Sequence, residues 1–152
     1  GYLPHNVVSN DDLAKILDIS DEWISTRTGI KSRHIAAAGE TTSQMAVAAA
    51  RRCLENADKS PKEVGMIIVS TVTGDLTFPS VAVLVQGRLG AVGGAAFDVQ
   101  AACAGFIYGL SIANNAIRLG ECETALVIGA EMISKIINQR DRSTAVLFGA
   151  AA

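Results

Sequence analysis

The chain has 152 residues, and its 13 Lys and Arg against 15 Asp and Glu make 18 % of it charged, with a net charge of −2. Soluble domains average about 25 % charged residues, and with an apolar fraction of 49 % this composition excludes a disordered segment and favours a domain with a large core. The weakly acidic balance argues against nucleic acid or an anionic membrane surface as the main partner.

The first forty residues predict two short helices and one short extended segment. Side chains that accept hydrogen bonds precede each helix, and a glycine follows the second. The expected segments are a helix capped by Asn10 or Asp11 and running to Leu17, a helix over 21–28 capped by Ser20 and ended by Gly29, and an extended piece over 30–35.

After residue 40, apolar runs alternate with amphipathic stretches. Of the 28 charged residues 18 lie before position 76, and residues 76–117 hold only Arg88 and Asp98, so the middle of the chain is core. Alternating buried strands and helices predict an α/β layered domain with right-handed crossovers. The expected elements are a helix over 41–57, a strand over 64–71, a helix over 79–89, a strand over 95–99, a helix over 104–119 ended by Gly120, a strand over 124–129, and a further strand beginning at 144–148.

Residues 99–117 form an uncharged stretch that is just long enough to span a bilayer. It contains Gln100, Ser111 and two asparagines. We therefore expect a buried helix of a soluble protein rather than a membrane span.

Chemistry is expected first after the 95–99 strand, because open α/β sheets place reactive groups beyond the carboxyl ends of their strands. Cys103 stands there among small residues, and the helix that follows directs its amino terminus at the sulfur. Such a terminus stabilises a thiolate, and its backbone N–H groups can hold an oxyanion on an attacked thioester carbonyl. Cys103 is a candidate nucleophile; the alternative is a small core residue.

The remaining cysteines and histidines predict no second centre. Cys53 falls on the apolar stripe of the 41–57 helix, and Cys122 lies between two glutamates, which disfavour a thiolate. The three cysteines are too widely spaced for a metal motif and indicate a reducing, cytoplasmic compartment. No glycine-rich nucleotide loop follows a strand, and neither His5 nor His34 has a local signature of a base for Cys103. We expect no metal.

Trp23 and Arg27 are four residues apart on one face of the 21–28 helix, so they present an indole and a guanidinium together. An aromatic, anionic ligand such as a nucleotide suits that surface. The alternative is a half-buried tryptophan with a solvated basic rim. Arg142, in the polar loop before residue 144, has the same ambiguity.

Seven strings carry a resemblance to a known family. They are Gly1-Tyr2-Leu3-Pro4, Ser20-Asp21-Glu22-Trp23-Ile24, Thr26-Arg27-Thr28-Gly29-Ile30, Arg33-His34-Ile35-Ala36, Phe78-Pro79-Ser80, Phe97-Asp98-Val99-Gln100-Ala101-Ala102-Cys103-Ala104-Gly105-Phe106 and Asp141-Arg142-Ser143-Thr144. Over essentially all 152 residues the chain resembles the β-ketoacyl-acyl carrier protein synthase III family, the thiolase-superfamily condensing enzymes that initiate bacterial fatty acid biosynthesis.

The resemblance implies a thiolase-like layered α-β-α-β-α fold, with residues 1–152 as its amino-terminal half-domain. It implies an acyltransferase of lipid metabolism, a cytoplasmic homodimer in which Cys103 takes the acyl group of an acyl-CoA, expected to be acetyl-CoA, as a thioester. Condensation with malonyl-acyl carrier protein follows. Coenzyme A is then part of the substrate, and no cofactor, nucleic acid or membrane is involved.

Site residues follow from the same resemblance. Trp23 and Arg142 resemble the pair that sandwiches the adenine of coenzyme A, and Phe78 resembles the residue that crosses a dimer interface to close the partner's acyl pocket. The coenzyme A site is thus expected at Trp23, Arg27, Thr28 and Arg142, and the acyl pocket at Phe78, Ile133 and Phe148.

Two departures from the family stand out. Members are about twice as long, and their second half brings a catalytic His and Asn that His5 and His34 do not match. Where the family reads Phe-Gly-Asp-Gly-Ala, residues 148–152 read Phe-Gly-Ala-Ala-Ala.

We expect these 152 residues alone to be inactive in condensation and unstable as a monomer, because half of a duplicated fold exposes apolar surface. The alternatives are a secondary-metabolite condensing enzyme that uses another acyl-CoA, and a non-catalytic half that binds coenzyme A or dimerises.

Overall fold

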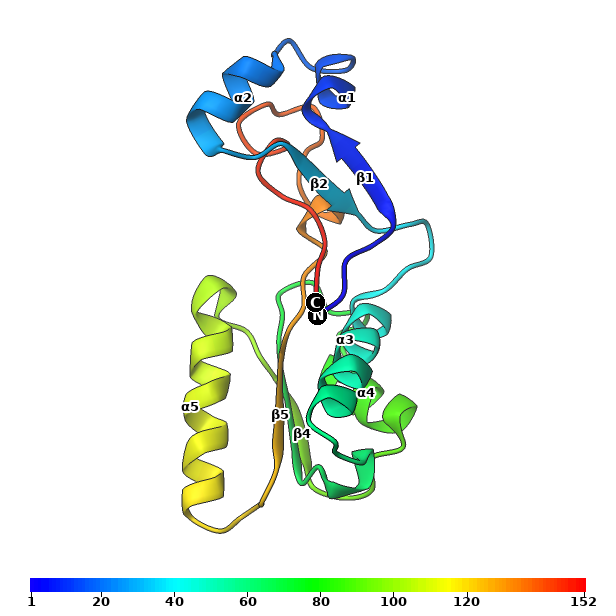
Figure 1. The fold of residues 1–152 in the computed structure, drawn as a ribbon, viewed down its shortest axis with the longest axis vertical. Coiled ribbons are helices and arrows are strands. Elements are labelled where there is room, and N and C mark those ends of the chain that lie inside the picture. The colour runs from blue at the N-terminus through cyan, green and yellow to red at the C-terminus, as the bar shows by residue number, and fades with distance from the viewer. The chain divides into compact units, whose positions relative to one another are not determined.

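The computed structural model describes residues 1–152, and they divide into two compact units. The first unit comprises residues 1–2, 41–131 and 152, and the second unit comprises residues 3–40 and 132–151. Each unit has its own sheet (Figure 1).

The first unit is built on a parallel three-stranded sheet in the order β4-β3-β5. β3 (Met66–Ser70) is central and pairs on its two sides with β4 (Ala95–Val99) and β5 (Ala125–Gly129). All five residues of β3 are buried, which confirms a strand covered on both faces.

Helices cover both faces of this sheet. α3 (Thr42–Asn56) and α4 (Val81–Leu89) lie on one face, and α5 (Gly105–Arg118) lies on the other (Figure 1). The side-chain alternation of β3 explains the two cores, since Ile67 and Val69 pack with α3 and α4 whereas Ile68 packs with α5. The predicted βαβαβ order is confirmed.

α5 packs on the sheet through its small residues. Gly105, Gly109, Ala113 and Ala116 are buried. The large apolar side chains lie exposed, namely Phe106, Ile107, Tyr108, Leu110, Ile112 and Ile117. The expectation of a buried helix was therefore wrong for the outer side of α5. Only small residues fit on its inner side, which closely approaches the strands, so the large apolar side chains lie on the outer side. No helix has both the length and the apolarity to cross a membrane.

The second unit pairs β1 (Asn6–Ser9) antiparallel with β2 (Ser32–Ile35) and carries α1 (Asn10–Ala14) and α2 (Asp21–Thr28). β1 was not expected. Ser20 caps α2 and Gly29 ends it with a φ of +72°, as predicted. α1 is shorter than predicted and is capped by Ser9 rather than Asn10 or Asp11.

The strand expected at 144–148 is absent: residues 144–147 form turns, and Phe148 belongs to no regular element. The Asp141 carboxylate accepts hydrogen bonds from the hydroxyls of Ser143 and Thr144, and this local bonding curls the backbone. Val146 is buried in the small core of the second unit, so the apolar run reflects core packing without strand pairing. Three short 3₁₀ helices complete the elements: η1 (Pro61–Glu63), η2 (Ala102–Ala104) and η3 (Ile133–Lys135).

Candidate functional site

Cys103 lies in η2, between the end of β4 and the start of α5, and its side chain is exposed. The preceding Ala102 has a φ of +45°. Placing a residue other than glycine in this left-handed region costs on the order of 1–3 kcal/mol, and backbone strain of this kind clusters at functional sites, where a side chain must be held in one position. The sharp strand-to-helix turn therefore holds the thiol out at the amino end of a 14-residue helix.

Close packing fixes the helix that follows the thiol. A Cβ on Gly105 would lie 2.1 Å from the Ser70 Oγ and 3.5 Å from the Val99 carbonyl oxygen. Only glycine lets α5 begin this near to the ends of β3 and β4. The backbone around Cys103 is thus held by the sheet.

Asp98, the carboxylate nearest to Cys103 in sequence, caps the amino end of α4. Its two oxygens accept hydrogen bonds of 2.8 Å from the backbone N–H groups of Val81 and Ala82, at the amino end of α4. Both oxygens are engaged in capping, so Asp98 is not poised as a base for the thiol. A lone acid in an otherwise uncharged stretch was the sequence signal for this role.

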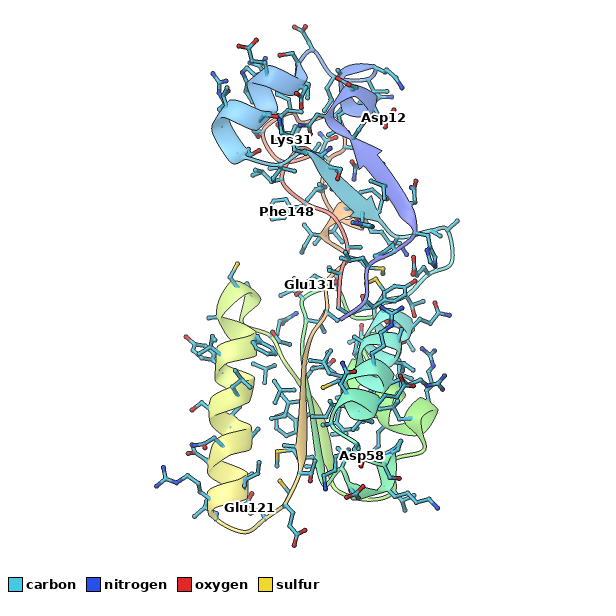
Figure 2. The ribbon with its side chains drawn as sticks, viewed as in Figure 1. Asp12, Lys31, Asp58, Glu121, Glu131 and Phe148 are labelled. Atoms are coloured by element: carbon cyan, nitrogen blue, oxygen red, sulfur yellow. The ribbon has the colours of Figure 1, made fainter.

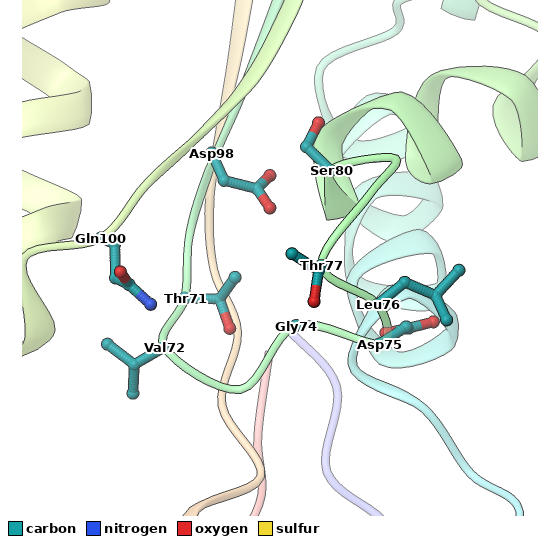
Figure 3. Close-up of a pocket in the computed structure, with 9 residues that line it drawn as sticks. All are labelled: Thr71, Val72, Gly74, Asp75, Leu76, Thr77, Ser80, Asp98 and Gln100. Atoms are coloured by element: carbon teal, nitrogen blue, oxygen red, sulfur yellow. The ribbon is translucent and has the colours of Figure 1, made fainter.

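An open cleft of about 810 Å³ lies at the carboxyl ends of β3 and β4. Figure 3 shows that Asp98 and Gln100 approach it from β4, and that the loop after β3 borders it from Thr71 to Thr77. Hydroxyl, amide and carboxylate groups thus surround the cleft.

The other cysteines and the histidines take no part in this arrangement. Cys53 is exposed, which corrects its expected place on the apolar stripe of α3, because the buried side runs through Ala46, Ala50 and Leu54 instead. His34 in the second unit is hydrogen-bonded through Nδ1 to the Pro4 carbonyl oxygen at 2.6 Å.

The expected coenzyme A residues lie in the second unit, and three of them meet there. The Arg27 guanidinium lies 4.5 Å from the centroid of the Trp23 ring, and the Arg142 guanidinium lies 5.7 Å from it. Thr28 differs, because its hydroxyl donates to the Ile24 carbonyl oxygen and accepts from the Ile30 N–H. The hydroxyl of Thr28 therefore stabilises the carboxyl end of α2.

The loop that carries Arg142 is fixed by Asp141. The Ser143 hydroxyl and N–H and the Thr144 hydroxyl donate to its carboxylate and hold the pKa of Asp141 below the ordinary value. Arg142 is thereby presented from a hydrogen-bonded turn.

The expected acyl-pocket residues divide between the units. Phe78 in the first unit is 86 % exposed, whereas Ile133 and Phe148 belong to the second unit, where Phe148 is 40 % exposed. Cys103 also belongs to the first unit. The labelled side chain of Phe148 can be followed in Figure 2.

Sequence reasoning missed a buried polar network in the second unit. The guanidinium of Arg33, which is 5 % exposed, donates to the Asn10 Oδ1 at 2.6 Å and to the Val146 carbonyl oxygen at 3.2 Å. Asn10 in turn donates to Asp21 at 2.7 Å. Burial lowers the pKa of Arg33. Three polar residues distant in sequence gave no local signal for this network.

Comparisons with known proteins agree with the strings above. The family described as 3-oxoacyl-[acyl-carrier-protein (ACP)] synthase III matches residues 97–152. The β-ketoacyl-[acyl-carrier-protein] synthase III of Rhodospirillum centenum is 57 % identical over 151 residues, which are 99 % of this chain and 47 % of that protein. The chain spans about half the length of the curated relatives it matches.

Solved structures show the same fold. The 3-oxoacyl-[acyl-carrier-protein] synthase III of Aquifex aeolicus superposes with a TM-score of 0.95 at 54 % identity, over 98 % of this chain and 48 % of that one. The priming β-ketosynthase of the R1128 polyketide pathway gives a TM-score of 0.94 at 43 % identity, over 98 % and 45 %. The expected thiolase-like fold is confirmed, and over its whole length the chain is similar in sequence and fold to about half of a β-ketoacyl-[acyl-carrier-protein] synthase III.

Proposed function

We propose that this protein is a β-ketoacyl-acyl carrier protein synthase III, an acyltransferase that condenses an acyl-CoA, acetyl-CoA first, with malonyl-acyl carrier protein. The observation that carries the proposal is the exposed Cys103 on a strained turn at the amino end of α5. Identity of 57 % to a curated synthase supports it.

The chemistry needs one nucleophile and two substrates. The Cys103 thiolate attacks the thioester carbonyl of acyl-CoA, the carbon–sulfur bond to coenzyme A breaks, and coenzyme A leaves as a thiolate that takes up a proton. Backbone N–H groups at the start of α5 stabilise the oxyanion of the intermediate. Malonyl-acyl carrier protein then loses CO₂, and its carbanion attacks the acyl carbonyl and releases Cys103.

Coenzyme A is proposed to bind at Trp23, Arg27, Thr28 and Arg142. Two guanidinium groups beside one indole suit a purine ring with phosphates, through stacking and charge. Because Arg142 lies 5.7 Å from the ring centroid, it must move outward to admit a purine between them.

Three further features belong to the proposal. The protein acts as a homodimer, it works in the cytoplasm, and Phe78, Ile133 and Phe148 line acyl pockets. The exposure of Phe78 supports a place at an interface, since large apolar side chains on a protein surface mark contact sites.

Mass spectrometry of the full chain after incubation with acetyl-CoA tests the nucleophile. We expect one acetyl group on the peptide that contains Cys103, and none after Cys103→Ser. Cys53→Ser is the matched control, because Cys53 is also an exposed cysteine and should leave the labelling unchanged. Acetyl on Cys53 with Cys103 unmodified would refute the proposal.

A second candidate is a condensing enzyme that primes secondary metabolism with another acyl-CoA. The likeness to the polyketide priming β-ketosynthase, at 43 % identity, favours it, but identity to the β-ketoacyl-[acyl-carrier-protein] synthase III of Rhodospirillum centenum is higher, at 57 %. Rates of Cys103 acylation with acetyl-, butyryl- and hexanoyl-CoA separate the two, since the first candidate requires acetyl-CoA to be fastest.

A further inference from the structure

The loop between β3 and α4, residues 71–80, is anchored more firmly than its exposure suggests. It follows the central strand and leads to Phe78, and it borders the cleft of Figure 3. Groups from three other elements or their ends bind the loop at two points and the start of α4 directly after it. Each anchor uses a polar group that the proposed chemistry leaves unassigned.

The first anchor is Glu131, two residues beyond the end of β5. Its Oε1 accepts the Val72 N–H at 2.8 Å, and its Oε2 accepts the Thr73 hydroxyl at 2.7 Å. A carboxylate that accepts two hydrogen bonds from adjacent residues fixes the backbone direction where the chain leaves β3.

The second anchor is the start of α3. The Thr42 hydroxyl donates to the Thr73 carbonyl oxygen, and the Ser43 N–H donates to the Asp75 carboxylate at 2.8 Å. Thr42 and Ser43 are both buried. Arg88 of α4 donates to the Ser43 hydroxyl, so α4 joins this anchor as well.

The third anchor is Asp98, which caps α4 just after the loop. Between the second and third anchors only two large apolar side chains project outward, Leu76 at 60 % and Phe78 at 86 % exposure. An exposed phenyl ring on a freely moving loop has no defined place, whereas one between two anchored points has a fixed base.

We propose that Glu131 is a positioning residue, which holds the 71–80 loop and thereby the place of Phe78, and so limits the length of the acyl chain that reaches Cys103 of the partner subunit in the proposed homodimer. The limit on chain length rests on the function proposed above, because it requires Phe78 to close an acyl pocket. The holding of the loop is independent of that function.

Two substitutions of Glu131 test whether its hydrogen bonds to Val72 and Thr73 hold the loop. Glu131→Ala removes both acceptors and leaves the Val72 N–H and the Thr73 hydroxyl without Glu131. Glu131→Gln keeps an oxygen for the Val72 N–H and offers an NH₂ group to the Thr73 oxygen, so it should restore most of the anchor. Glu121→Ala is the matched control, since Glu121 is an exposed glutamate before β5, at the opposite end of that strand from Glu131 (Figure 2).

Amide hydrogen exchange and acylation are measured on the full chain for all four proteins. We expect faster exchange of residues 71–78 in Glu131→Ala only. We also expect the octanoyl-CoA to acetyl-CoA ratio of Cys103 acylation rates to rise about tenfold in Glu131→Ala, with Glu131→Gln close to the unmodified protein.

Each outcome of these measurements supports or overturns one part of the proposal. Unchanged exchange in Glu131→Ala overturns the positioning role, and so does a Glu131→Gln protein as altered as Glu131→Ala. Faster exchange with an unchanged acylation ratio overturns the limit on chain length. If the unmodified protein takes no acyl group from any coenzyme A thioester, the proposed function fails, while exchange still decides whether Glu131 holds the loop.

Discussion

Adding one methyl group to the buried side of α5 tests how tightly this helix is seated. In Gly109→Ala the new Cβ would lie 2.9 Å from the Val127 Cγ1 and 3.3 Å from the Ile68 Cγ2. In Gly87→Ala the same methyl group enters α4 where no atom outside the backbone of the helix itself and the adjacent residues lies within 4 Å. The two substitutions are chemically identical and differ only in their surroundings.

The magnitudes follow from two opposing effects. Gly→Ala inside a helix stabilises by about 1 kcal/mol, because the unfolded chain loses conformational freedom. Overpacking a close contact costs about 1–3 kcal/mol, and Ile68 cannot yield because it is fully buried in the central strand. Gly87→Ala should therefore raise the free energy of unfolding by up to about 1 kcal/mol, whereas Gly109→Ala should lower it by up to about 2 kcal/mol.

Urea unfolding of the full chain measures both free energies. Val127→Ala provides the internal check, because it removes the nearest methyl group. Gly109→Ala should cost less in that background, with a coupling of at least about 0.5 kcal/mol. If Gly109→Ala stabilises the protein as much as Gly87→Ala does, the packing argument for α5 is refuted.

Three other outcomes follow from the contacts described. Asp98→Ala should lower the free energy of unfolding by about 1–3 kcal/mol, measured in urea, because two N–H groups of α4 lose their acceptor; an unchanged value would contradict the capping role. The pKa of Asp141 is held low chiefly by the Ser143 hydroxyl. The ionised Asp141 carboxylate therefore stabilises the folded state fully at pH values above its pKa in the unfolded chain, about 4, and this stabilisation is lost as the pH falls through its lower pKa in the folded state. Ser143→Ala should raise that pKa in an NMR titration, and no shift would refute the cause. Trp23 is the chain's one tryptophan, so its fluorescence should report coenzyme A binding; Arg142→Ala should weaken binding about tenfold while Arg140→Ala, an exposed neighbour, should not, and equal effects would contradict stacking.

Local chemistry explains why most of the first unit was predictable. Thr41 and Ser80 accept hydrogen bonds from the N–H groups of the helices they precede, and Gly90 ends α4 with a φ of +72°. Such caps depend on residues three or four positions apart, which a sequence displays directly. The same holds for β3, whose uninterrupted apolar run requires cover on both faces.

Features set by distant residues were not predictable. The 144–148 run has strand-like composition, but the Val146 carbonyl oxygen accepts a hydrogen bond from Arg33, more than a hundred positions earlier. Likewise Thr73 meets Glu131 only because β3 and β5 are neighbours in the sheet. The position of Cys103 after β4 was predictable from element order, whereas the left-handed Ala102 before it had no sequence signal, since alanine rarely adopts that conformation.

The glycines of α5 have a mechanical consequence for the thiol. Gly105 abuts Ser70 of β3 and the end of β4, while Gly109, one turn further, abuts β3 and β5. The buried side of α5 thus contacts all three strands, with Ser70 and Ile68 of β3, Val99 of β4 and Val127 of β5 next to its glycines. The position of Cys103 therefore depends on the packing of α5 against β3, β4 and β5 as well as on the turn at Ala102, so a substitution in the strands can displace the thiol without touching it.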